Sequence, residues 1–145
     1  KKIRLYKFAT MLKNSENMGT GTVTLKNDER ILPFGHFLRK SKINELPQFI
    51  NVFLGNMSLV GPRPQMKRDF EKFHDDVQQN MYRSKPGITG LAQVKGFRGE
   101  IETNEDIINR VKFDIYYLEN WSLILDLNIV FLTAINFLTG HKKAY

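Results

Sequence analysis

The chain has 145 residues, a length that fits one domain and leaves little room for two independent cores. Its apolar fraction of 41% and charged fraction of 26% exclude collagen-like, low-complexity and strongly disordered chains. The sequence contains no cysteine, which excludes a disulfide framework, a thiolate metal site and a cysteine nucleophile.

Basic side chains are concentrated in the first half of the sequence. The whole chain has 22 Lys and Arg against 15 Asp and Glu, for a net charge of +7. Residues 1–68 hold 13 basic and 4 acidic side chains, a balance of +9, whereas residues 69–145 hold 9 and 11, a balance of −2. The basic half is therefore expected to face an anionic partner, for which phosphate, nucleic acid and an acidic membrane surface are candidates.

Two short strands are predicted near the N-terminus. Residues 3–11 alternate as a strand does, which would project Lys7 from one of its faces. A lysine in such a place is more often a solvated charge than a ligand. Residues 22–25 favour a second short strand, which would end before a turn at residues 27–28.

Two helices are predicted in the middle of the chain. Pro33 suits the first turn of a helix over residues 33–40. A second helix is expected to start near Asn44, because Pro47 is tolerated only in a first turn, and to end at Gly55. The residues expected to point inward from the two helices are Phe34, Phe37, Leu38, Leu46, Phe49, Ile50, Phe53 and Leu54.

The next segment cannot be regular helix, because each proline of residues 61–64 fixes its own φ and pushes the preceding residue toward extended backbone. Arg63 is therefore expected on a stiff segment. A polar helix is predicted over residues 65–82, a turn over 85–90, and a helix from a capping box at Thr103 through Glu119. The apolar face of that last helix comprises Ile107, Val111, Ile115 and Leu118.

Residues 123–138 are almost wholly apolar, but 16 residues with polar interruptions fall short of the roughly 20 that span a bilayer. They predict a buried or interfacial helix. Asp126 and Thr133 lie two turns apart and share a narrow polar stripe. An unpaired buried carboxylate is costly, so Asp126 is expected to meet a cation, a metal ion or a helix end, unless it faces water.

Asn44 and Glu45 lie at a predicted helix start, where unpaired N–H groups and the helix dipole favour anions. A carboxylate among cations suits a magnesium-assisted diphosphate reaction, because the metal takes hard oxygens and the cations hold phosphate. The alternative is that Asn44 is only an N-cap and Glu45 a first-turn acid. Arg63 likewise is either a phosphate clamp or a solvated residue of a Pro-rich turn. The cations nearby in the sequence are Arg39, Lys40, Lys42 and Arg63.

Four sequence blocks cover nearly the whole chain: YKFATM (6–11), FLRKSKINELPQFINVFLGNMSLVGPRP (37–64), KPGITGLAQVKGFRGE (85–100) and FDIYYLENWSLILDLNIVFLT (113–133). In this order they resemble the bacterial sugar transferases, also called monotopic phosphoglycosyl transferases. The resemblance implies transfer of a sugar 1-phosphate from a nucleoside diphosphate sugar, usually a UDP-sugar, to undecaprenyl phosphate. Such a step starts the assembly of a capsule, exopolysaccharide, lipopolysaccharide O-antigen or glycoprotein glycan.

The resemblance also implies Mg²⁺ as cofactor and a ping-pong route in which the Asp of an Asp-Glu pair becomes phosphorylated. Carried over by position, that pair falls on Asn44 and Glu45. Glu45 matches the acid that helps to hold magnesium, and Asp126 matches a further active-site carboxylate that is expected to hold it too. The positions that match cations near the phosphates are Lys7, Arg39 and Arg63.

Two residues depart from the family pattern. Asn44 stands in the place of the nucleophilic Asp, and Ala9 stands where the motif usually has Arg or Lys. Because a neutral amide cannot form an acyl phosphate, either Glu45 is the nucleophile, or the substitution traps or abolishes catalysis, or the aligned residue is not the nucleophile here. We favour an enzyme with Glu45 as the essential carboxylate; the alternative is a catalytically silent, membrane-associated binding protein of the same fold.

The predicted fold is a small, compact, mostly helical α+β domain over residues 1–145, with short N-terminal strands and amphipathic helices on a membrane surface. The re-entrant membrane helix of the family is expected upstream, which would place this catalytic portion at the cytoplasmic face of a bacterial inner membrane. Anionic headgroups there contribute about 1 kcal/mol per nearby basic residue. No nucleic-acid partner is expected, because aromatic residues are not interleaved with the basic ones.

Overall fold

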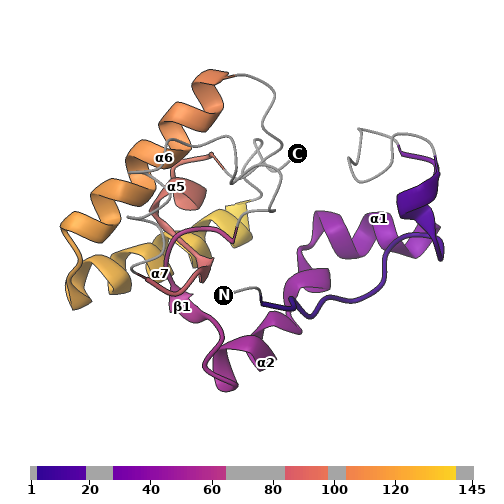
Figure 1. The fold of residues 1–145 in the computed structure, drawn as a ribbon, viewed down its shortest axis with the longest axis horizontal. Helices are drawn as coiled ribbons and strands as arrows, with labels where there is room; N and C mark the ends of the chain where they lie inside the picture. Colours follow the sequence, from indigo (N-terminus) through magenta and orange to yellow (C-terminus); the bar gives the residue numbers. More distant parts are fainter. Residues whose placement is uncertain (1–2, 19–27, 65–83, 98–103, 140–145) are drawn as a thin grey trace. The chain divides into compact units, whose positions relative to one another are not determined.

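The computed structural model describes residues 3–18, 28–64, 84–97 and 104–139 (Figure 1). The chain divides into two compact units, the N-terminal unit Lys1–Asn51 and the C-terminal unit Val52–Tyr145. The strand predicted at 22–25, the polar helix predicted at 65–82 and the capping residue Thr103 lie outside the described residues. The single domain expected over the whole chain stays a prediction.

The N-terminal segment is extended but does not form the strand predicted over residues 3–11. Within the described part of the chain, its one ladder contact is an isolated antiparallel bridge between Met11 and Ile31. The Leu12 N–H donates to the Arg30 carbonyl at 2.9 Å as part of this bridge, whereas the Phe8 N–H donates to the Asn44 carbonyl at 3.0 Å. The prediction is wrong because the alternating sequence finds its hydrogen-bond partners in loops rather than in a second strand.

Helix α1 (Pro33–Lys40) has the predicted bounds, with Pro33 in its first turn. A short 3₁₀ turn, η1 (Ser15–Asn17), precedes it in the same unit. The prediction that Phe34 and Phe37 point inward is wrong, since these side chains are 66% and 56% exposed. The helix packs instead through Gly35, where a Cβ atom would collide with the Thr10 carbonyl. A glycine lets the helix backbone approach the extended segment closely.

The helix predicted from Asn44 is interrupted. A 3₁₀ turn, η2 (Ile43–Glu45), follows Lys42 in the left-handed conformation, and helix α2 (Gln48–Phe53) begins only afterwards. Gly55 has φ of +71°, as expected for a helix-ending glycine. The prediction that the apolar face of this helix is buried is wrong, because α2 buries Gln48 and Asn51. The exposed apolar residues here are Leu46, Phe49, Ile50, Phe53 and Leu54.

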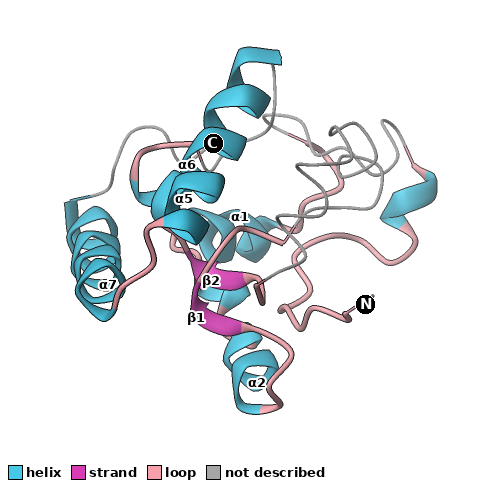
Figure 2. Cartoon of the chain, turned by 60° about the vertical axis from the view of Figure 1, so that its left-hand side comes forward, coloured by secondary structure: helices cyan, strands magenta, loops and turns pink. Residues whose placement is uncertain are grey.

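The C-terminal unit contains a parallel pair of short strands, β1 (Ser58–Val60) and β2 (Gly87–Thr89), which lie side by side in Figure 2. Ser58 pairs with Gly87 and Val60 with Thr89. The Gly61 N–H then donates to the Thr89 carbonyl at 2.9 Å, and a Cβ at Gly61 would collide with the Lys85 carbonyl. Residues 61–64 are not helical, as predicted, whereas the turn predicted over 85–90 contains β2.

Three helices complete this unit: α5 (Leu91–Val94), α6 (Asn104–Glu119) and α7 (Leu123–Thr139). Helix α7 contacts both strands and α5, and α5 contacts α6. Both α6 and α7 end close to the predicted positions. The α+β class with mostly helical content is confirmed, although the described strands lie at 58–60 and 87–89 rather than near the N-terminus. No helix among the described residues is long and apolar enough to cross a membrane. The buried core comprises Val60, Leu91, Val94, Tyr117 and Ile129.

Helix α7 packs on the unit through a side that combines its polar stripe with the apolar residues Leu125, Ile129 and Leu132. Ile129 is 1% exposed at the centre of that side. On the same side, the hydroxyls of Thr133 and Thr89 lie 2.7 Å apart, and the Asn136 amide donates to the Val94 carbonyl at 3.1 Å. The stripe predicted from Asp126 and Thr133 therefore faces the protein. The apolar residues left exposed include Leu123, Ile124, Leu127, Phe131 and Leu138.

Candidate functional site

Lys7 and Glu45 form an ion pair in the N-terminal unit. The Lys7 Nζ lies 3.0 Å from the Glu45 Oε1, and their side chains are 39% and 16% exposed. The residues on either side of Lys7 are held by hydrogen bonds from their backbone N–H groups. The Tyr6 N–H donates to the Asn51 side-chain oxygen at 3.0 Å, and the Phe8 N–H donates to the Asn44 carbonyl. The structure therefore brings together two of the predicted site residues that are 38 positions apart in the sequence.

Asn51 is a buried anchor that the sequence analysis missed. Its side chain is fully buried, and its amide also donates to the Arg4 carbonyl at 2.7 Å. One side chain thus satisfies two backbone groups of the extended segment that carries Lys7. The signal in the sequence was weak, because Asn51 occupies a position between apolar residues of a helix that was predicted to bury its apolar face.

Asn44 and Glu45 do not start an α-helix. Both belong to η2, the residue before that turn is Lys42, and no side chain caps the turn. The interpretation of Asn44 as an N-cap is therefore wrong, and so is the argument from the dipole of a helix beginning there. Both side chains are half-buried. Glu45 is positioned by its ion pair with Lys7 rather than by a helix end.

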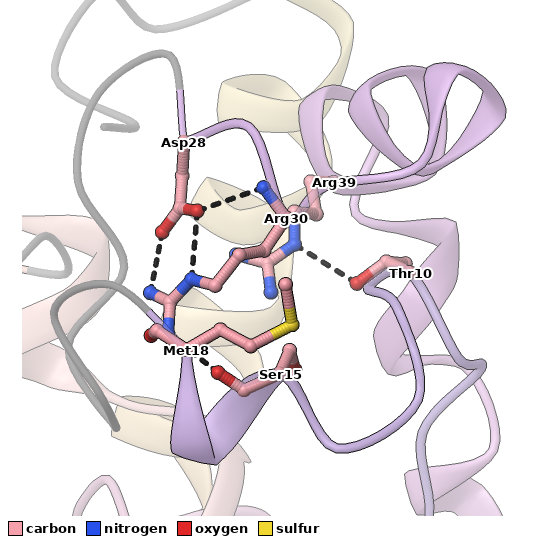
Figure 3. A network of polar contacts seen from close by, with 6 residues as sticks. All are labelled: Thr10, Ser15, Met18, Asp28, Arg30 and Arg39. Atoms are coloured by element: carbon pink, nitrogen blue, oxygen red, sulfur yellow. Dashed lines mark hydrogen bonds and ion pairs between the residues drawn. The ribbon is translucent and has the colours of Figure 1, made fainter.

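Arg39 lies in the last turn of α1 and donates from Nε to the Thr10 Oγ1 at 2.9 Å, as Figure 3 shows. The same figure shows a second arginine with a different role. Arg30 donates to Asp28 through Nε at 2.8 Å and to the carbonyls of Ser15 and Met18 through Nη1. The side chains of Arg30 and Asp28 are each 6% exposed, which identifies them as a buried structural clasp.

Asp126 lies in the first turn of α7 and binds two neutral donors. The Tyr117 hydroxyl donates to Oδ1 at 2.8 Å, and the Trp121 indole N–H donates to Oδ2 at 3.1 Å. Burial, together with the neighbouring carboxylate, raises the pKa of Tyr117 well above its usual value, so this hydroxyl stays a donor. Among the described residues, the hydrogen-bond donors to the Asp126 carboxylate are therefore two neutral aromatic side chains, whereas the sequence predicted a cation, a metal ion or a helix end.

A cavity of about 620 Å³ lies beside Asp126 within the C-terminal unit. It runs from β1 to the end of α6 and holds the charged groups of Lys85, Glu119 and Asp126. The remaining lining residues are Ser58, Val60, Ser84, Ile115, Tyr117, Leu118 and Trp121.

Asp114 is a second residue that the sequence analysis missed. It is 1% exposed on α6, and its Oδ2 has no hydrogen-bond partner among the described residues. Burial raises the pKa of Asp114 to about 7, against the lowering effect of the positive charges of Arg110 and Arg63. Arg63 therefore lies within electrostatic reach of a buried acid. The spacing of Arg110, Asp114 and Tyr117 at helical intervals is the signal that could have indicated a buried polar stripe.

The predicted site residues are divided between the two units. Lys7, Arg39, Asn44 and Glu45 belong to the N-terminal unit, and Arg63 and Asp126 to the C-terminal unit. A site that uses all six stays a prediction.

The predicted magnesium ligands fit the ion unequally. Glu45 offers a carboxylate beside a cation, which suits an ion that takes one or two carboxylates together with substrate phosphates. Asp126 already accepts one hydrogen bond at each carboxylate oxygen, which leaves one further lone pair on each for a metal ion. The described residues contain no cluster of three or more side chains of metal-ligating type.

A family model described as "Bacterial sugar transferase" matches residues 1–140. The chain belongs to the bacterial sugar transferase family, as its sequence blocks indicated. It is 46% identical over 92% of its length to an Escherichia coli UDP-glucose:undecaprenyl-phosphate glucose-1-phosphate transferase, of which it covers 29%. It is 42% identical over 94% of its length to an Aeromonas hydrophila UDP-N-acetylgalactosamine-undecaprenyl-phosphate N-acetylgalactosaminephosphotransferase, of which it covers 32%.

One further relative matches this chain over most of the relative's own length. The chain is 37% identical over 98% of its residues to the exopolysaccharide production protein PSS of Rhizobium leguminosarum bv. phaseoli, of which it covers 74%. It spans less than a third of the E. coli and Aeromonas relatives.

Proposed function

We propose that this chain is the catalytic part of a phosphoglycosyl transferase that moves a sugar 1-phosphate from a nucleoside diphosphate sugar, in particular a UDP-sugar, to undecaprenyl phosphate. Family membership over residues 1–140 supports this reaction, and so do the relatives named as transferases of glucose 1-phosphate and of N-acetylgalactosamine phosphate. The structural observation that carries the proposal is the Lys7–Glu45 pair, an anchored cation beside a half-buried carboxylate.

In the proposed reaction, the bond between the two phosphates of the donor breaks and UMP leaves. The sugar phosphate ends on the phosphate of the lipid acceptor, with Glu45 as the essential carboxylate. Lys7, Arg39 and Arg63 bind phosphoryl oxygens, since ammonium and guanidinium groups are strong donors to phosphate. Mg²⁺, held by Glu45 and Asp126, would supply neutralisation of the diphosphate charge.

A second candidate function is supported by one residue. Asn44 replaces the acid expected at the nucleophilic position, and an amide cannot form an acyl phosphate. A protein that binds the nucleotide sugar or the polyprenyl phosphate without turnover would also keep this fold.

We place the protein at the cytoplasmic face of a bacterial inner membrane, where undecaprenyl phosphate would be reached. The support comes from apolar side chains that each unit leaves exposed. On α7, Ile124 and Leu138 are 73% and 83% exposed, although the helix is mostly apolar. In the N-terminal unit, Phe34 on α1 is 66% exposed. Helices of this kind lie in the membrane interface with their apolar side toward the acyl chains, and basic residues strengthen the attachment.

The test measures UMP release by the full-length protein with Mg²⁺, undecaprenyl phosphate and a panel of UDP-sugars that includes glucose, galactose and N-acetylgalactosamine. Glu45→Gln should lower turnover by about 100-fold or more if Glu45 is the essential carboxylate. Retained UDP-sugar binding with no turnover in either protein would favour the binding function. An absence of both turnover and binding across the panel would refute the proposal.

A further inference from the structure

Thr10 is a buried polar residue of the N-terminal extended segment, and it lies beside the start of α1. It is 6% exposed, and its carbonyl accepts the Leu32 N–H at 3.0 Å. The next residue, Met11, bridges Ile31, and Gly35 packs directly against the Thr10 carbonyl. The backbone of Thr10 is therefore held from several sides, and its hydroxyl occupies a defined place.

The Thr10 hydroxyl accepts the Nε–H of Arg39 at 2.9 Å (Figure 3). A guanidinium is planar and presents five N–H groups in a rigid fork. A bond at Nε fixes the plane and leaves the four N–H groups on Nη1 and Nη2 to bind a ligand. Among the described residues, the Arg39 guanidinium makes one hydrogen bond, to Thr10. Arg30 differs, because its guanidinium donates both to Asp28 and to backbone carbonyls.

We propose that Thr10 is a positioning residue for Arg39: its hydroxyl orients the guanidinium so that Nη1 and Nη2 present a two-pronged donor to the diphosphate of the nucleotide sugar. This inference rests on the proposed function, in which Arg39 binds phosphate. An ordered guanidinium loses less side-chain freedom when a ligand binds, and the saving for one long side chain corresponds to about tenfold in affinity. Thr10 acts through Arg39 and does not touch the substrate.

The experiment is a double-mutant cycle in the full-length protein, read as kcat/KM for the UDP-sugar. Thr10→Val keeps the size and branching of the side chain and removes the acceptor, whereas Thr10→Ser keeps the hydroxyl. Each change is made with Arg39 present and in an Arg39→Ala background. Thr139→Val is the matched control, because Thr139 is exposed and its hydroxyl donates to the Ile135 carbonyl within α7.

We expect Thr10→Val to lower kcat/KM for the donor by about tenfold when Arg39 is present, and by little when Arg39 is alanine. Thr10→Ser should restore most of the activity, and Thr139→Val should change it little. Equal losses with and without Arg39, or no loss in either background, would overturn the proposal.

A readout that does not need turnover is the ¹⁵N–¹H resonance of the Arg39 Nε group. It should move in Thr10→Val and return toward the wild-type position in Thr10→Ser; an unchanged resonance would also overturn the proposal. If Thr10→Val does not fold, Thr10→Ala is substituted and the same cycle applies. Wild-type protein that neither binds nor turns over any UDP-sugar refutes the proposed function, whereas an active wild type with additive effects refutes only the role of Thr10.

Discussion

The buried carboxyl of Asp114 predicts an unusual dependence of stability on pH. Its pKa rises from 3.8 to about 7 in the folded protein, chiefly because burial disfavours the charged form. Between these two values the folded state keeps a proton that the unfolded state has released. The free energy of unfolding should therefore fall as pH rises from about 4 to about 7, and level off above the folded pKa.

The perturbation that tests this is Asp114→Asn, which keeps the shape of the side chain and removes its ionisation. The pKa of Asp114 rises by about 3, and a change of one in pKa corresponds to about 1.4 kcal/mol. The ionisation of Asp114 therefore changes the free energy of unfolding by about 4 kcal/mol. At pH 4 the protonated acid and the amide are electrostatically alike. Relative to the wild type, the variant should therefore gain about 4 kcal/mol between pH 4 and pH 8.

The assay is urea unfolding followed by circular dichroism at pH values from 4 to 8. The matched control is Glu105→Gln, which removes an exposed carboxylate from the same helix. Parallel pH dependences of the wild type and Asp114→Asn, with a difference that changes by less than about 1 kcal/mol over the range, would contradict the reasoning.

Three further predictions concern the N-terminal unit and α7. Asn51→Ala should lower the free energy of unfolding by about 2–4 kcal/mol in a urea titration, because it leaves two backbone groups of the extended segment without a partner; an effect below about 0.5 kcal/mol would refute the anchor. Asn44→Asp should increase UMP release if a carboxylate at this position is the nucleophile, and unchanged release would exclude that role. The double variant Leu127→Gln, Phe131→Gln should reduce co-sedimentation with anionic vesicles by about tenfold or more, with the urea midpoint little changed; equal sedimentation would argue against membrane contact through α7.

The sequence predicted helices well where a local signal marks their ends. Pro33 defined the start of α1, and the apolar run after Trp121 defined α7. The side of each helix that is buried was harder to predict, because the helical period shows which side is apolar but not which side another element covers. Phe34 and Phe53 were expected to point inward and are exposed, whereas the polar stripe of α7 faces the protein.

The candidate site was predictable mainly from family resemblance. Lys7 and Glu45 are 38 residues apart, and no periodic pattern connects them. Asn51 and Asp114 were missed for a related reason: a polar residue on a helix is usually solvated, and its burial follows from tertiary contacts that local sequence does not encode. The strand predicted over 3–11 failed because a backbone can satisfy its N–H groups with side-chain amides and loop carbonyls instead of a ladder.

One side of α7 packs on the protein and the other side is exposed, so the two sides can be changed separately. Ile129, Thr133 and Asn136 tie the helix to the rest of the C-terminal unit, while Ile124 and Leu127 are 73% and 62% exposed. Folding and surface adhesion can therefore be tuned by separate sets of substitutions. A variant polar on the outer side alone should crystallise and give sharp solution spectra without detergent, while it retains the native interior.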